Sequence, residues 1–151
     1  SYIAPGYNYT TFLKAFGASA NKSYWPYQWF TSLDKLNTTR FPEYTDFYST
    51  LKSCNTLEPG NSELTDTETT LIGRIPTSNS PLTSAENIEI GQYRYENLRQ
   101  MFYGNSWSMR DLLEYYNNLD VKPFLEALNN LTAYYIHEES TYLKTRFQVG
   151  L

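Results

Sequence analysis

Histidine and cysteine are almost absent from this chain of 151 residues, which contains one of each, Cys54 and His137. A zinc site built from Cys and His alone needs about four such ligands, so the sequence excludes that class of site. The single cysteine also excludes an internal disulfide, which favours a reducing compartment. Long apolar runs are missing as well, and none approaches the roughly 20 residues that a membrane-spanning helix needs. We therefore expect no transmembrane segment and no membrane partner.

The beginning of the sequence lacks a secretory signal. Residues 1–9 carry neither a basic start nor an apolar run, and a signal peptide has both. We therefore expect an intracellular protein, with cytoplasm, nucleus and organelle left open, and not a secreted one. The length suits one domain of ordinary size. A formal net charge of −4 speaks against a dedicated basic nucleic-acid binder.

The charges are distributed unevenly along the chain. Residues 1–56 carry five basic and three acidic side chains, whereas residues 57–91 carry one basic and six acidic ones. Basic and aromatic side chains interleave in the first part, as they do in grooves that bind single-stranded nucleic acid. The candidate contacts are Lys14, Lys22, Trp25 and Tyr27. The alternatives are a solvated surface for the charges and core packing for the rings.

Apolar residues recur at helical spacing through most of the chain, which predicts a mostly α fold. We expect helices over 9–16, 26–36, 42–51 and 85–104, and a last one that begins at a Ser108/Asp111 cap and bends just after Asp120 because of Pro123. Residues 71–75 are a weak strand candidate. Three segments result: a helical 1–54, a Ser/Thr/Pro-rich loop or insertion over 55–84, and a helical 85–151.

One pair of side chains in the last predicted helix suggests a catalytic site. Tyr116 and Asp120 are one helical turn apart, so their side chains emerge next to each other. A carboxylate can bind a divalent ion while a neighbouring phenol hydrogen-bonds the attacking water or the scissile phosphate, as metal-assisted phosphodiester hydrolysis requires. The same spacing is also typical of an ordinary helix with its Tyr in the core and its Asp in water.

The sequence around this pair resembles the third exonuclease motif of family B DNA polymerases, above all of the protein-primed group. Residues 115–128 read YYNNLDVKPFLEAL, and in that group Tyr-Asn-Asn-x-Asp-Val is followed by a Pro-Phe pair and an apolar helix. Earlier segments resemble the same group in the same order: FLKAF at 12–16, WPYQWF at 25–30, SLDKL at 32–36 and FYSTLK at 47–52. The resemblance covers most of the chain except 55–81 and the last dozen residues.

The resemblance implies a function and a fold. Asp120 would be a ligand of a catalytic Mg²⁺ or Mn²⁺, and Tyr116 would orient the water or phosphate during 3′→5′ removal of a mispaired nucleotide. The partners would be a single-stranded primer terminus and the remainder of the polymerase chain. The segment would be the helical C-terminal part of an RNase H-like α/β exonuclease domain.

Other parts of the family's site have no counterpart in this sequence. Asp66-Thr67-Glu68 has the spacing of the family's Asp-x-Glu motif, but it comes after segments that should follow it, so we interpret it as solvated loop. The family's exonuclease lysine would fall near Lys14. Matching the segments to the family's pattern, however, places Thr11 at the position of that lysine. Because one Asp cannot build a two-metal site, we expect the isolated chain to be inactive. The alternatives are a small helical protein-interaction module and a catalytically dead DNA-binding relic.

Overall fold

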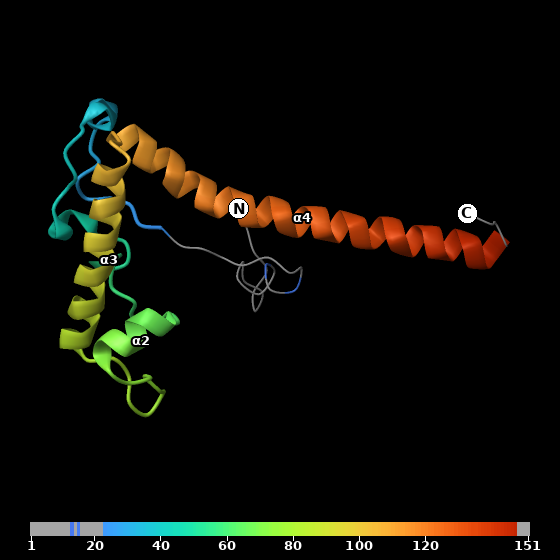
Figure 1. Cartoon of the computed structure of the whole chain (residues 1–151), viewed down its shortest axis with the longest axis horizontal. Helices are drawn as coiled ribbons and strands as arrows, with labels where there is room; N and C mark the ends of the chain where they lie inside the picture. Colours follow the sequence, from blue (N-terminus) through green and yellow to red (C-terminus); the bar gives the residue numbers. More distant parts are fainter. Residues whose placement is uncertain (1–12, 14, 16–22, 148–151) are drawn as a thin grey trace. The chain divides into compact units, whose positions relative to one another are not determined.

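The computed structural model describes residues 13, 15 and 23–147, with side chains up to 145. The described part of the chain is mostly helical (Figure 1), as the sequence predicts. It also has one very small sheet. Its elements are two 3-10 helices, η1 (Leu33–Asn37) and η2 (Tyr44–Phe47), two strands, β1 (Tyr48–Ser49) and β2 (Cys54–Asn55), and three α-helices, α2 (Asp66–Ile72), α3 (Ser84–Gly104) and α4 (Met109–Phe147).

The chain divides into two compact units. One unit is residues 24–114, and the other combines residues 1–23 with residues 115–151. Helix α4 therefore begins in the first of these and continues into the second. The three segments expected over 1–54, 55–84 and 85–151 stay a prediction. The helix expected over 9–16 lies outside the described residues, except for Leu13 and Ala15, which are helical.

Helix α3 forms one side of the core of the 24–114 unit. Its buried residues are Ile90, Gly91, Leu98 and Phe102, which recur at the spacing of one helical face. The predicted bounds of this helix are correct to within one residue. Ile88, two residues before the fully buried Ile90, is 44% exposed.

An aromatic cluster fills the core between α3 and the segment that leads into η2. The ring of Phe41 lies 5.2 Å from that of Phe102, 5.3 Å from that of Tyr95 and 5.8 Å from that of Phe47, centroid to centroid. Tilted pairs at these distances stabilise a core beyond the area that they bury. The polar ends of the rings are also used: Tyr95 Oη donates to the carbonyl of Pro42 at 2.7 Å.

Gly91 allows a close approach between α3 and the η2 segment. A Cβ atom at this position would lie 2.5 Å from Tyr44 Oη and 3.1 Å from Glu58 Cγ. Tyr44 Oη donates to Glu58 Oε1 at 3.1 Å. Burial raises the pKa of the Tyr44 phenol, and the Glu58 carboxylate raises it further. Glycine at this position therefore makes room for a tyrosine–glutamate hydrogen bond.

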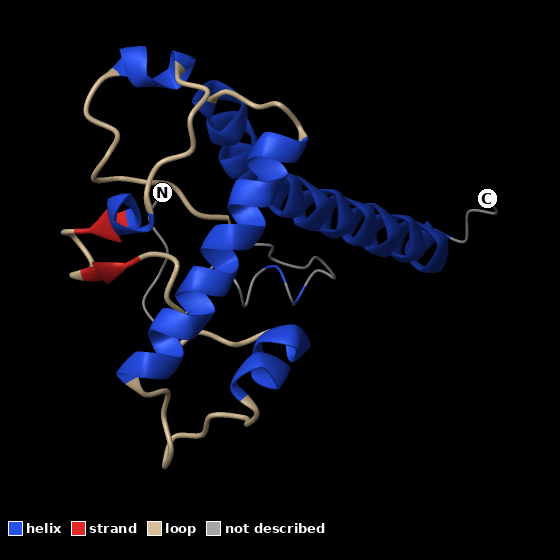
Figure 2. Cartoon of the chain, turned by 60° about the vertical axis from the view of Figure 1, so that its left-hand side comes forward, coloured by secondary structure: helices blue, strands red, loops and turns tan. Residues whose placement is uncertain are grey.

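The helices predicted over 26–36 and 42–51 are wrong. Only η1 and η2 form there, and residues 27–29 make a turn. After η2 the chain extends into the antiparallel pair of β1 and β2, drawn in red in Figure 2, with Tyr48 opposite Asn55. The backbone N–H of Thr56 donates to the carbonyl of Phe47 at 3.0 Å. Pairing across this hairpin replaces the helical hydrogen bonds that the apolar spacing alone predicted.

Helix α2 lies within 55–84, the segment expected to be a Ser/Thr/Pro-rich loop or insertion. The strand candidate at 71–75 and the loop interpretation of Asp66-Thr67-Glu68 are therefore wrong. A capping box starts the helix: Thr65 Oγ1 accepts from the N–H of Glu68 at 3.3 Å, and Glu68 Oε1 accepts from the N–H of Thr65 at 3.0 Å. This reciprocal pair satisfies two backbone donors that a helix N-terminus leaves open.

Arg94 connects α2 to α3 through a buried ion pair. Its guanidinium donates through Nε and Nη2 to both carboxylate oxygens of Glu68 and through Nη1 to the carbonyl of Leu57 at 3.2 Å. The two charged side chains are only 11% and 5% exposed. The guanidinium also lies 5.6 Å from the centroid of the Tyr24 ring. In Figure 1, α2 lies beside the N-terminal half of α3.

A second arginine holds the loop between α2 and α3. Arg74 donates through Nε to Glu86 Oε2 at 2.7 Å and through Nη2 to Glu86 Oε1. Glu86 also accepts from the N–H of Thr83, in a second capping box at the start of α3. The hydrogen bonds from Arg74 and then from Thr83 lower the pKa of Glu86 to about 2. The Ser/Thr-rich segment is thus ordered by two Thr-x-x-Glu boxes, each with its own arginine.

The low pKa of Glu86 predicts a titration at unusually acidic pH. An NMR titration of the side-chain carboxyl should show Glu86 changing near pH 2, well below the ordinary glutamate value of about 4.3. Because the folded pKa lies below the unfolded one, the stabilisation is present above about pH 4.3 and is lost as the pH falls toward 2. In the variant Arg74→Met the titration should move up toward the ordinary value, and no movement would contradict the assignment.

Among the described residues, none of the helices combines the length and the apolar content that a membrane-spanning helix needs.

Candidate active site

The first turn of α4, which leads to the predicted catalytic pair, has the expected cap. Asp111 Oδ2 accepts from the backbone N–H of Ser108 at 2.9 Å and from its hydroxyl at 3.2 Å. The N–H of Met109 donates to the carbonyl of Thr38 at 2.8 Å, and the side chains of Met109 and Leu112 are fully buried. These contacts hold the start of the helix that carries Tyr116 and Asp120.

Tyr116 and Asp120 lie on consecutive turns of α4. Tyr116 is half-buried and Asp120 is exposed. The helix continues through Pro123 without a break, although proline has no N–H to donate to the carbonyl of Leu119. The expected bend after Asp120 stays a prediction. Pro123 and Ala127, further along the helix, are buried.

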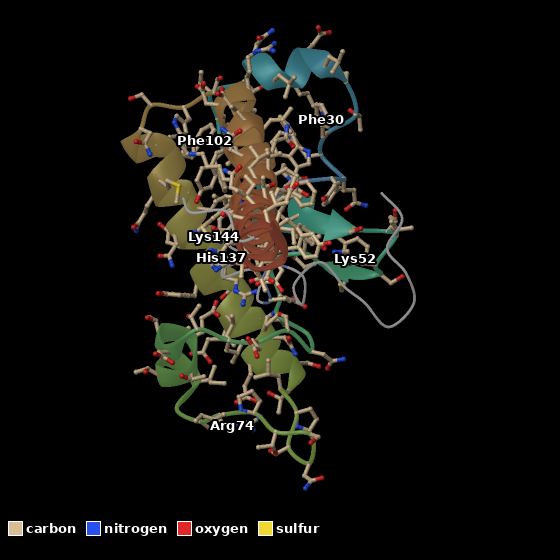
Figure 3. All side chains as sticks on the ribbon, turned by 90° about the vertical axis from the view of Figure 1, so that its right-hand side faces the viewer. Phe30, Lys52, Arg74, Phe102, His137 and Lys144 are labelled. Carbon is tan, nitrogen blue, oxygen red and sulfur yellow. The ribbon has the colours of Figure 1, made fainter. Side chains whose placement is uncertain are left out.

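The described residues do not by themselves fit a catalytic pair of metal ions. Within the part of the chain that the structure describes, no three or more His, Cys, Asp or Glu side chains come together as a metal site would require. Asp120 can supply one carboxylate, whereas two-metal catalysis needs several oxygen ligands around ions about 4 Å apart. Glu68, in the Asp-x-Glu run, is engaged by Arg94, and His137 is exposed on α4 (Figure 3).

The predicted nucleic-acid contacts have different surroundings. Trp25 is 3% exposed and packs edge-on against Phe30, with ring centroids 5.3 Å apart. Tyr27 is 48% exposed, so its ring is accessible from solvent. Lys14 and Lys22 lie outside the described residues. The core-packing alternative therefore describes Trp25 well, while Tyr27 keeps a surface on which a base could stack.

A basic–aromatic pair that the sequence analysis did not single out lies nearby. Lys35 Nζ is 5.1 Å from the centroid of the Trp29 ring and donates to the carbonyl of Trp29 at 2.6 Å. A cation over an indole ring is a favourable arrangement. The two residues are six positions apart across a turn, so no helical or strand periodicity indicates their contact.

A cavity of about 740 Å³ lies in the region of α2. Its lining includes Glu63, Leu64, Ile75, Pro76 and Leu82. None of the predicted catalytic or nucleic-acid-binding residues lines it.

Comparisons with protein-family models, with curated proteins and with solved structures found no match to this chain. Evidence for a function therefore comes from the residues of the chain itself.

Proposed function

We propose that this chain is part of a protein-primed family B DNA polymerase and contributes to its 3′→5′ proofreading exonuclease. The observation that carries the proposal is the position of Tyr116 and Asp120 on consecutive turns of one uninterrupted helix. They lie within the run 115–128 that resembles the third exonuclease motif. The Ser108/Asp111 cap supports it, because the cap defines the start of the helix that carries both side chains.

The exposure of the two side chains suits their proposed roles. The exposed carboxylate of Asp120 is accessible to serve as one ligand of Mg²⁺ or Mn²⁺, and oxygen ligands are those such ions prefer. The half-buried Tyr116 has less freedom to move, so its hydroxyl can be held toward water or phosphate. Because the described residues lack the other carboxylates, the proposal places those ligands on the remainder of the polymerase chain.

Exposed apolar side chains on α4 support the proposal of a large partner. They run along much of the helix and are Val121, Phe124, Leu125, Tyr134, Tyr135, Ile136, Tyr142 and Leu143. An exposed apolar surface of this extent on a water-soluble protein usually marks an interaction surface. In the proposed domain, which would be RNase H-like and intracellular, this surface would pack against parts of the exonuclease domain outside the chain.

The test is to remove the proposed ligand from the longest reading frame that contains this sequence. With Mg²⁺ and a 5′-labelled single-stranded oligonucleotide, Asp120→Asn should slow 3′→5′ degradation by about 100-fold or more, equivalent to about 2.7 kcal/mol of transition-state stabilisation. Polymerisation should be largely retained, because the polymerase site lies in a different domain. Tyr116→Phe should cause a smaller loss. The isolated chain should show no degradation.

Matched controls separate catalysis from general damage to the helix. Glu126→Gln removes an exposed carboxylate from the same helix, and Tyr135→Phe removes the hydroxyl of an exposed tyrosine. Both variants should degrade the oligonucleotide at the unchanged rate. Loss of both activities in Asp120→Asn, or of neither, would count against the assignment.

The exposed apolar residues of α4 favour a second candidate, a helical protein-interaction module. In that case Tyr116 and Asp120 can be changed without effect on nucleic-acid processing, whereas Tyr135→Asp should weaken partner binding. A catalytically dead relic would degrade no oligonucleotide but would still bind one, with an affinity that falls steeply as salt rises.

A further inference from the structure

Arg74 organises the loop between α2 and α3 by binding two parts of it at once. Besides Glu86, its guanidinium donates through Nη1 to the carbonyl of Ser80 at 3.0 Å and to the Ser80 hydroxyl oxygen at 2.9 Å. It also donates through Nη2 to the carbonyl of Pro81 at 2.9 Å. Figure 3 labels Arg74 in this loop. The serine and the glutamate therefore share one cation.

Ser80 is presented in an accessible turn. The backbone groups of Thr77 and Ser80 bond to each other in both directions, at 3.0 and 3.1 Å. Residues 77–81 are all exposed. Ser80 is followed by Pro81, and in the whole sequence this is the single serine or threonine that precedes a proline.

The chemistry of this turn suits an enzyme that modifies serine. The hydroxyl oxygen of Ser80 accepts the bond from Arg74, so the proton that a modification would replace is not needed for this contact. Pro81 has no backbone N–H and a fixed φ angle, which an enzyme groove shaped for proline can select. A guanidinium at hydrogen-bond distance can then receive a phosphate with charge-assisted bonds.

We propose that Ser80 is a phosphorylation site for a proline-directed protein kinase, and that phosphoserine 80 competes with Glu86 for Arg74. The Ser80 oxygen attacks the γ-phosphorus of ATP, a new O–P bond forms, and the bond from that phosphorus to the β–γ bridging oxygen breaks. ADP leaves, and the hydroxyl proton passes to a base of the kinase.

The consequence is a change in the contacts that hold the start of α3. A phosphoserine carries a charge of about −1.5 to −2 at neutral pH, so it is a stronger partner for a guanidinium than a carboxylate is. It also brings like charge toward Glu86. Glu86 would keep its bond from the Thr83 N–H but lose part of its interaction with Arg74, which loosens the loop from the helix.

The test treats the full chain with a proline-directed kinase and Mg-ATP and locates phosphate by mass spectrometry. We expect one phosphate, on Ser80, and none in Ser80→Ala. The control Ser78→Ala changes an exposed serine two residues away and should leave incorporation intact. Absence of phosphate, or incorporation that Ser80→Ala does not abolish, would overturn the site.

A second readout tests the competition for Arg74. In the phosphorylated chain, the NMR titration of Glu86 should move up from about 2 toward the ordinary pKa of a glutamate, because Arg74 is drawn away and a negative group is nearby. A Glu86 titration that stays where it was would show that the phosphate does not take the guanidinium.

Discussion

Replacing Arg94 with methionine should lower the free energy of unfolding of this chain by about 3–5 kcal/mol. The reason is the burial of its partner: the Glu68 side chain is only 5% exposed. Removal of Arg94 would leave that carboxylate without its ion pair in a place that water hardly reaches. The carbonyl of Leu57 would also lose its bond from Arg94. Chemical denaturation of the two proteins, followed by circular dichroism, measures the difference.

An arginine on the same helix provides the matched control. Arg99 pairs with Glu96 at 3.3 Å, but its side chain is 46% exposed. Arg99→Met should therefore lower the free energy of unfolding by less than about 1 kcal/mol. Equal losses in the two variants would contradict the argument from burial.

The effect of Arg94→Met should also depend on pH. Burial raises the pKa of Glu68, but the hydrogen bonds from Arg94 and from Thr65 lower it by more, so the net shift is downward. The stabilisation is then present above the ordinary glutamate pKa of about 4.3 and is lost as the pH falls through the lowered value. Without Arg94, burial dominates and Glu68 protonates more readily. The difference between the two proteins should shrink in acid.

Phe102→Ala should have the second large effect, because it should lower the free energy of unfolding by about 3–5 kcal/mol. The ring of Phe102 is fully buried. It lies 5.2 Å from the ring of Phe41 and 5.3 Å from that of Tyr103. Truncation would remove these contacts and leave a cavity between α3 and the aromatic cluster. The midpoint of denaturation should fall accordingly.

An apolar residue on the outer side of α3 tests whether the loss comes from the core. Ile88 is 44% exposed, and Ile88→Ala should change stability by only about 0.5 kcal/mol. Phe102→Leu leaves a smaller cavity, so its loss of stability should lie between those of Phe102→Ala and Ile88→Ala. A loss in Phe102→Ala no greater than that in Ile88→Ala would show that the ring is not part of the core.

Much of α3 and α4 could be predicted because their signals are local. Helix α3 has an apolar face of several turns, and the start of α4 has the Ser108/Asp111 cap. Each depends on residues close together in the chain, where spacing translates directly into shared position on a helix. The relative position of Tyr116 and Asp120 could be predicted in the same way, since their spacing alone places them on neighbouring turns.

The segment over 55–84 shows where that reasoning fails. Its Ser, Thr and Pro content predicts a loop or insertion, yet Thr65-x-x-Glu68 and Thr83-x-x-Glu86 are both helix starts. Their spacing is a signal that the sequence contains. What the sequence does not contain is the pairing of these glutamates with Arg94 and Arg74, which lie 26 and 12 residues away.

Local pattern by itself therefore determined the helical class of this protein, the extent of α3, the start of α4 and the spacing of Tyr116 and Asp120. Tertiary structure alone decided that 42–51 becomes η2 and a hairpin, that Trp25 is buried and Tyr27 exposed, and that Glu68 is engaged by an arginine. The physical reason is range. Helical spacing acts over one or two turns. Burial and ion pairing depend on which distant segments come into contact, and those contacts form only in the folded tertiary structure.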